Sequence, residues 1–165
     1  MFSPSCDFAL RKAASAEDSR MKGFTLIELV VAISIIGVLS ALGYIGVKTY
    51  LDRAQISAAI ADVRNIDMKI KTYFNERLDY PATLADVGMG GLMDPWKRPY
   101  VYWPITGDPT QKVRKDRNLH PLNTDFDLFS VGKDGDTNLA LTAQASHDDI
   151  IRASDGHYVG LASGY

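Results

Sequence analysis

The sequence predicts an α+β protein in which one long N-terminal helix precedes a set of short strands. Two observations predict the helix: an apolar run over 24–47, and a stretch over 48–78 that contains neither proline nor glycine. The third observation is that 79–165 alternates short apolar segments with turn residues, as small sheets do. We therefore divide the chain into a leader at 1–23, two helix halves and a small C-terminal domain.

The apolar run FTLIELVVAISIIGVLSALGYIGV extends for 24 residues from Phe24 to Val47 and contains one formal charge, Glu28. An α-helix rises about 1.5 Å per residue and the hydrocarbon core of a bilayer is roughly 30 Å thick, so this run can cross a membrane. A carboxylate costs about 2.5–3.5 kcal/mol at the centre of such a span and less near its end. Glu28 therefore needs a partner, and the apolar side of the chain offers none within reach.

The residues at the start of this run form a specific motif. The segment KGFTLIEL at 22–29 resembles the class III prepilin signal of type IV pilins and of the pseudopilins of type II secretion systems. In that family a membrane prepilin peptidase cuts after the glycine and methylates the new terminal amine. The resemblance implies cleavage between Gly23 and Phe24 with N-methylation of Phe24, and it implies the pilin fold, a long helix packed on a small antiparallel sheet.

Glu28 is predicted to be an assembly residue. Cleavage after Gly23 would create a cationic amine at the head of the apolar helix. In a helical stack of subunits this amine can meet the Glu28 carboxylate of a neighbour, and each charge then offsets the other's cost of burial. The alternative is an ordinary signal anchor with Glu28 at the depth of the lipid headgroups. The position of the charge, five residues into the run after a Lys-Gly pair, favours assembly.

The chain outside the helix gives weaker signals. The start codon is either Met1 or Met21, and the second choice leaves the short leader Met-Lys-Gly. A net charge of −2 makes no strong case for nucleic acid. Because the one cysteine, Cys6, lies in the predicted leader, the mature chain can form no internal disulfide. A metal ion is the usual substitute in a small exported domain.

The helix is expected to continue beyond the apolar run to about Leu78. Apolar residues in its second half recur at three- and four-residue spacing, which indicates an amphipathic helix. They are Ile56, Ile60, Val63, Ile66, Ile70 and Tyr73. We expect the helix to end before Pro81, because the residue before a proline is pushed out of the α region. The segment 82–87 is expected to add one helical turn.

Three later segments are predicted strands: Tyr100–Trp103, Asp125–Val131 and His157–Val159. The second alternates polar and apolar residues, as a half-buried strand does. The segment DPWKRPY at 94–100 resembles the major pseudopilins, in which it opens the small antiparallel sheet that packs on the helix. We expect Trp96, Tyr100 and Tyr102 to be sheet and core residues rather than a ligand surface.

A polar loop at 106–123 carries four basic residues, which are Lys112, Arg114, Lys115 and Arg117. Such a cluster can hold DNA phosphates, but no aromatic residue is interleaved with it for base stacking. We therefore expect a solvated loop or a subunit contact and no nucleic-acid partner. A DNA-binding or adhesive minor pilin that acts through these residues is the alternative.

Aspartates gather in the last third of the chain. Seven lie between Asp125 and Asp155, against Lys133 and Arg152, and like-charge repulsion penalises this excess unless a cation lies among them. The segment DGDTN at 134–138 has the alternation that opens a calcium-binding loop, although the positions that follow exclude an EF-hand.

The major pseudopilins of type II secretion contain a comparable S-x-G-x-D-G turn, followed by a D-D-I or A-D-I run, that binds one Ca²⁺. Carried over to this sequence, the resemblance implies Ca²⁺ ligation by Asp134, Asp148, Asp149 and the main-chain carbonyl of Val131. The 13 residues between Asp134 and Asp148 exceed the short loop of that family, so the ligand set is open. The alternative is that these aspartates serve turns and caps, with Asp148 or Asp149 capping a short helix.

The function we expect from the resemblance is a pseudopilin subunit that polymerises into a periplasmic filament for type II protein secretion. The implied partners are further copies of the chain, minor pseudopilins, the prepilin peptidase and an inner-membrane assembly platform. Before assembly the chain would cross the bacterial inner membrane once, with its C-terminal domain in the periplasm. The alternative is a subunit of a type IV pilus for adhesion, motility or DNA uptake. No nucleophile motif or phosphate-binding glycine loop appears, so an enzyme, which would be anchored in the membrane, is not expected.

Overall fold

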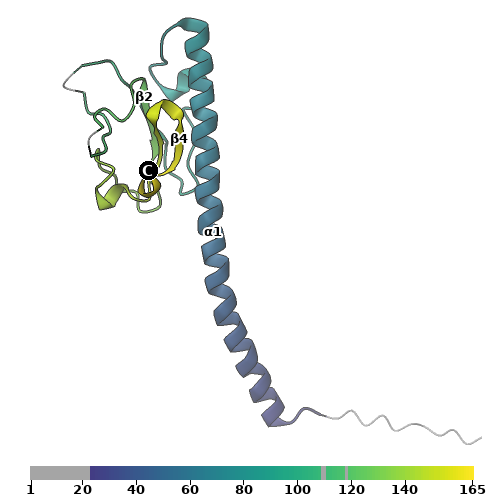
Figure 1. The fold of residues 1–165 in the computed structure, drawn as a ribbon. Helices are drawn as coiled ribbons and strands as arrows, with labels where there is room; N and C mark the ends of the chain where they lie inside the picture. The colour runs from purple at the N-terminus through teal and green to yellow at the C-terminus, as the bar shows by residue number, and fades with distance from the viewer. Residues whose placement is uncertain (1–22, 109–110, 118) are drawn as a thin grey trace, which may run out of the picture. The chain divides into compact units, whose positions relative to one another are not determined.

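The computed structural model describes residues 23–108, 111–117 and 119–165. One long helix, α1 (Leu26–Arg77), precedes a four-stranded antiparallel sheet (Figure 1). The predicted α+β arrangement is confirmed, and α1 begins and ends within two residues of the predicted limits. Contacts divide the chain into two compact units, Met1–Gly43 and Tyr44–Tyr165, here called the N-terminal and the C-terminal unit.

The part of α1 in the N-terminal unit has no buried face. Every side chain from Phe24 to Leu42 is exposed, including apolar residues such as Ile27, Ile33 and Ile36. Among the described residues, α1 is the one helix that is long and apolar enough to cross a membrane. Its first half therefore finds no apolar partner among the residues that the structure describes.

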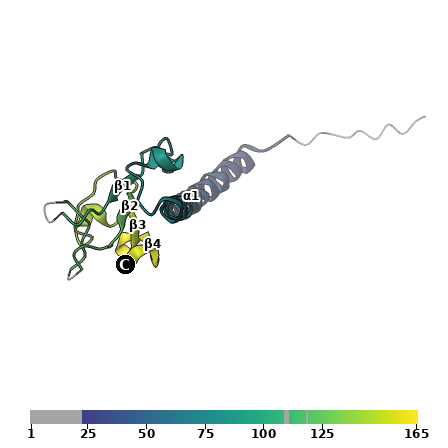
Figure 2. The same cartoon turned by 90° about the horizontal axis from the view of Figure 1, so that it is seen from above.

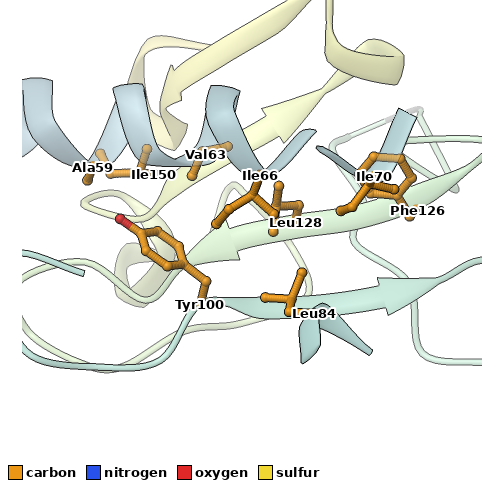
Figure 3. Close-up of a cluster of buried hydrophobic side chains, with 9 residues drawn as sticks. All are labelled: Ala59, Val63, Ile66, Ile70, Leu84, Tyr100, Phe126, Leu128 and Ile150. Carbon is orange, nitrogen blue, oxygen red and sulfur yellow. The ribbon is translucent and has the colours of Figure 1, made fainter. Parts of the chain in front are cut away.

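The part of α1 in the C-terminal unit buries one stripe. Ala59, Val63, Ile66 and Ile70, at alternating four- and three-residue spacing, have no exposed surface. They pack against Leu84, Tyr100, Phe126, Leu128 and Ile150 to form the core between helix and sheet (Figure 3). The predicted stripe is confirmed, with Ile56 and Ile60 half-buried at its edge and Tyr73 outside the cluster.

The sheet has the strand order β1-β2-β3-β4, so each strand pairs with its neighbour in the chain (Figure 2). The strands are β1 (Val101–Pro104), β2 (Phe126–Ser130), β3 (Ile150–Ala153) and β4 (Tyr158–Leu161). All three pairings are antiparallel; Tyr102 lies opposite Leu128, and Ile151 opposite Gly160. Only β3 and β4 are joined by a short connection, whereas long segments lead from β1 to β2 and from β2 to β3.

The prediction of a half-buried second strand was wrong, because all five residues of β2 are buried. The strand is central, and apolar clusters cover both of its faces. Phe126 and Leu128 face the helix, whereas Phe129 packs in a second cluster. The other members of that cluster are Leu122, Leu141, Ile151, Ala153 and Ala162.

Four smaller differences concern the other strands and the turn after α1. The strand β3 was not predicted, since its four residues directly follow two aspartates. The strand β1 includes Pro104, which was expected to close it; Pro104 fits because β1 is an edge strand, and its carbonyl accepts a hydrogen bond from Gln111 Nε2 at 2.6 Å. The last strand, β4, begins one residue later than predicted and is one residue longer. The turn expected over 82–87 is a 3-10 segment, Leu84–Val87.

Candidate functional site

Glu28 lies in the first turn of α1, where Thr25 holds its carboxylate. The Thr25 N–H and hydroxyl donate to Glu28 Oε2 at 3.0 and 2.8 Å, and the Glu28 N–H donates to Thr25 Oγ1 at 3.3 Å. This reciprocal pair is a capping box, and negative charge is favoured at a helix N-terminus. This partner of Glu28 was not predicted, although the spacing Thr-x-x-Glu is typical of a capping box.

The capping box satisfies hydrogen bonds of Glu28 but not its charge. Both groups that Thr25 contributes are neutral, and among the described residues no ion pair to Glu28 forms. The neighbouring side chains are apolar and exposed, with Phe24 87% and Leu29 59% accessible. Within the described part of the chain, the Glu28 carboxylate thus has no counter-ion and lies at the end of an exposed apolar helix.

The predicted processing residues lie just before this turn. Gly23 and Phe24 are exposed and precede the first helical residue, Leu26. A peptide bond outside regular structure is accessible to a peptidase. Lys22 and the rest of the predicted leader lie outside the described residues, so cleavage after Gly23 stays a prediction.

The predicted calcium ligands divide into two groups. Asp148 lies beside the turn after β2, where its Oδ2 accepts the main-chain N–H groups of Lys133 and Asp134 at 2.7 and 2.9 Å. Asp134 Oδ1 accepts the N–H of Asp136 at 2.9 Å. These are the turn and capping contacts of the alternative interpretation. Val131, at the start of the turn, packs half-buried against the second apolar cluster.

Asp149 is turned into the protein instead. Its side chain is fully buried, and its Oδ2 accepts hydrogen bonds from Arg114 Nη2 and Thr137 Oγ1, each at 2.6 Å. Burial raises the pKa of the Asp149 carboxyl, and the Thr137 hydrogen bond and the Arg114 charge oppose that rise. Asp148 therefore contacts Asp134, whereas Asp149 forms an ion pair with Arg114.

The side chains of the predicted ligands do not form the expected calcium site. Calcium takes about six to eight oxygen ligands. In the part of the chain that the structure describes, no three Asp, Glu, His or Cys side chains come together around one point where a metal ion would fit. The acceptors of Asp148 and Asp149 named above are occupied by main-chain N–H groups and by Arg114. Calcium ligation by Val131, Asp134, Asp148 and Asp149 thus stays a prediction from the resemblance.

The prediction of a solvated basic loop was wrong for Arg114, whose side chain is 2% exposed. Its N–H donates to Asp127 Oδ2 at 2.7 Å, and its guanidinium lies 4.2 Å from the centre of the Phe129 ring. Lys112, Lys115 and Arg117 are exposed as expected. No local pattern marks Arg114, because its carboxylate partner Asp149 is 35 residues away in the sequence.

A second buried arginine connects α1 to the sheet. Arg152 Nη2 lies 2.6 Å from Asp125 Oδ2, and its Nε lies 2.5 Å from Asp67 Oδ1 of the helix. Its guanidinium also lies 3.9 Å from the Phe126 ring centre. Burial acts to lower the pKa of Arg152, but the two carboxylates outweigh it and raise the pKa above the usual value. The sequence analysis missed this network, whose members come from three separate segments.

Known proteins resemble both parts of the chain. A family profile described as the prokaryotic N-terminal methylation motif matches residues 18–44. The type II secretion system core protein G of Pseudomonas aeruginosa is 32% identical over 133 residues, covering 70% of this chain and 86% of that protein. Core protein G of Dickeya chrysanthemi is 26% identical over 118 residues, covering 72% and 74%.

Fimbrial proteins match a shorter region. A fimbrial protein of Neisseria meningitidis serogroup A is 33% identical over 73 residues, which is 44% of this chain and 43% of that protein. No solved structure matches the chain significantly. The similarity to core protein G thus extends over more of the chain than the similarity to fimbrial proteins.

Proposed function

This chain belongs to the family of type II secretion system core protein G, the major pseudopilins, and from that membership we propose that it polymerises through α1 into a periplasmic pseudopilus. One observation carries the proposal: every side chain from Phe24 to Leu42 is exposed although most are apolar. A continuous apolar surface of this size is costly in water and marks a contact with lipid or protein. The first half of α1 would contact lipid before assembly and the helices of neighbouring subunits after it.

Before assembly, lipid covers the first half of α1. Its length and composition suit a single crossing of the inner membrane, and the C-terminal domain would then lie in the periplasm. The prepilin peptidase then cuts between Gly23 and Phe24 and methylates the Phe24 amine. The new terminus lies at the start of the apolar helix.

During assembly, the helices of neighbouring subunits replace the lipid. The Glu28 carboxylate has no counter-ion among the described residues of its turn, and the Phe24 amine of the next subunit supplies one. The Thr25 hydrogen bonds hold the carboxylate at the helix end, so part of the ordering cost is met before the subunits meet. The inner-membrane platform and the minor pseudopilins would start and drive this addition.

The test separates the charge of Glu28 from its capping role. Glu28→Gln keeps an acceptor for the Thr25 hydrogen bonds and removes the charge, whereas Glu28→Ala removes both. We expect both variants to be cleaved after Gly23 and neither to form filaments, measured by mass spectrometry and by pseudopilus pull-down. Filaments of normal length from Glu28→Gln would show that the charge is not required.

Mass spectrometry of the native protein tests the processing step directly. The expected N-terminal residue of the functional form is methylated Phe24. A functional form that retains residues 1–23 has no amine at Phe24, and the proposed pairing with Glu28 would then be wrong.

The alternative is a subunit of a surface type IV pilus, which the fimbrial relatives support over 44% of the chain. Mechanical shearing of cells distinguishes the two functions. A pseudopilus subunit stays with the cell envelope, and a surface pilin is recovered in long sheared fibres.

A further inference from the structure

Asp149 is a buried carboxylate that requires a positive partner. It lies in the long insert between β2 and β3 and has no exposed side-chain surface. An ionised carboxylate without a counter-charge is strongly unfavourable inside a protein. The cation that contacts it, among the described residues, is the Arg114 guanidinium, with Nη2 2.6 Å from Oδ2.

Arg114 is held by contacts of its main chain and of both terminal nitrogens of its guanidinium, whereas its Nε has no hydrogen-bond partner within the described residues. Its N–H donates to Asp127 Oδ2 at 2.7 Å, and its carbonyl accepts the Leu122 N–H at 2.8 Å. The guanidinium stacks 4.2 Å from the Phe129 ring centre, and Nη1 donates to Thr137 Oγ1 at 3.2 Å. Because the side chain is already ordered and desolvated, its charge is available to Asp149 at little further entropic cost.

These contacts join three parts of the C-terminal unit that are distant in sequence: the loop that contains Arg114, the central strand β2, and the insert that contains Thr137 and Asp149. A calcium ion bound as the resemblance implies would also hold this insert. We propose that in this chain the guanidinium of Arg114 is the cation that holds the insert, so that the C-terminal unit folds without calcium.

A calcium ion and Arg114 would compete for the same carboxylate. After the Arg114 and Thr137 contacts, Asp149 retains one oxygen, Oδ1, which is buried and has no hydrogen-bond partner within the described part of the chain. One oxygen supplies only a small part of the roughly six to eight ligands that calcium needs. A divalent ion at Oδ1 would also lie next to the guanidinium and be repelled by it. Because Arg114 occupies Asp149, calcium cannot use this carboxylate as the resemblance implies.

Thermal unfolding of the full-length chain in detergent tests the proposal. Tryptophan fluorescence reports on this region because the Trp103 ring lies 5.2 Å from that of Phe129, which Arg114 covers. We expect the same unfolding midpoint in excess EDTA and in millimolar calcium. A midpoint that rises by more than about 5 °C with calcium would overturn the proposal, because that shift corresponds to a bound structural ion.

Substitution of the arginine is the second test. Arg114→Met leaves Asp149 buried without a counter-charge, and we expect the midpoint to fall by about 10 °C or more. The matched control is Lys115→Met, which removes the same charge from the exposed neighbouring residue and should change the midpoint by less than about 3 °C. Equal midpoints for Arg114→Met and the wild type would contradict the proposal.

A third set of variants covers the case in which Arg114→Met does not fold. Arg114→Lys keeps the charge but not the planar, stacked geometry, and it should melt between the wild type and Arg114→Met. The double variant Arg114→Met, Asp149→Asn removes both charges and should be more stable than Arg114→Met alone. A double variant that is no more stable would show that the pair is not the source of the effect. None of these readouts depends on filaments, so their failure would leave the proposed assembly function standing.

Discussion

The two halves of α1 are both rich in isoleucine, yet the first exposes Ile27, Ile33 and Ile36, whereas the second buries Ile66 and Ile70. Ile36 in the N-terminal unit is 61% exposed, whereas Ile66 in the C-terminal unit is fully buried. The first half is apolar on all sides, and the second confines its apolar residues to one stripe that faces the sheet. The comparison shows that, among the described residues, only the second half of the helix obtains its packing from its own chain.

The difference separates folding from assembly. Contacts inside the chain set the stability of the C-terminal unit, while lipid or neighbouring subunits must set the stability of the N-terminal half of α1. Substitutions in the two regions should therefore change different measurements. The following four predictions test that separation, beginning with the largest effect.

Breaking the buried ion pairs of Arg152 should destabilise the C-terminal unit most. Arg152→Met leaves Asp67 and Asp125 without their buried cation, and we expect the free energy of unfolding in urea to fall by about 3–5 kcal/mol. Lys71→Met is the matched control, because Lys71 also pairs with Asp67 but is 46% exposed. It should cost about 1 kcal/mol or less. Similar losses for both variants would show that burial does not decide the contribution.

The isoleucine pair tests the comparison directly. Ile66→Ala opens a cavity between helix and sheet and should cost about 2–5 kcal/mol in the unfolding of the C-terminal unit. Ile36→Ala should change that free energy by less than about 0.5 kcal/mol and should instead lower the yield of filaments. If Ile36→Ala destabilised the C-terminal unit as much as Ile66→Ala, the two regions would not be independent.

Alkaline pH should act on the C-terminal unit through Tyr100. Its hydroxyl donates to Asp62 Oδ2 at 2.9 Å, and burial, the hydrogen bond and the Asp62 charge raise the pKa of Tyr100 far above its usual value. The unfolded chain loses this proton near pH 10, at about the usual tyrosine pKa, and the folded chain does not. The contribution of Tyr100 to the free energy of unfolding is therefore fully present below about pH 10, and it decreases as the pH rises further.

The variant Tyr100→Phe should lose about 0.5–1.5 kcal/mol at neutral pH and show a shallower decrease above pH 10 in urea unfolding curves. Tyr50→Phe is the control, since Tyr50 lies on α1 and is 73% exposed. Its pH curve should match that of the wild type. An unchanged alkaline slope in Tyr100→Phe would contradict the assignment.

The smallest effect is expected for the surface ion pair between Lys133 and Asp52. Lys133 Nζ lies 2.8 Å from Asp52 Oδ1, but the two side chains are 53% and 38% exposed. Lys133→Met should change the free energy of unfolding by less than about 1 kcal/mol, and high salt should remove even that difference. A loss similar to that of Arg152→Met would show that exposure does not separate the two kinds of ion pair.

Local patterns made the helix, its buried stripe and the Thr25–Glu28 region accessible from the sequence. Val63, Ile66 and Ile70 recur at three- and four-residue spacing, which predicts the buried stripe. Pro81 predicts the end of the helix. The pairing of Thr25 with Glu28 was also local and was missed only because the charge was considered without its hydrogen bonds.

The errors concern side chains whose partners are far away in the sequence. The strand β2 was expected to be half-buried because it contains Asp127 and Ser130. These polar groups are satisfied inside the protein, Asp127 by Arg114 and Ser130 by Asp94. Periodicity describes one segment at a time, and it cannot show that a polar residue has a buried partner 13 or 36 residues away.

The two outer strands of the sheet limit how domains of neighbouring subunits can join. The strands β1 and β4 have four residues each, and β1 ends at Pro104, whose nitrogen has no hydrogen to donate. Short outer strands, one of which ends at a proline, are poor templates for the addition of a strand from another molecule. Growth by continuous sheet, as in amyloid, is thereby disfavoured, and subunits can form an ordered polymer without edge-to-edge pairing of their C-terminal sheets.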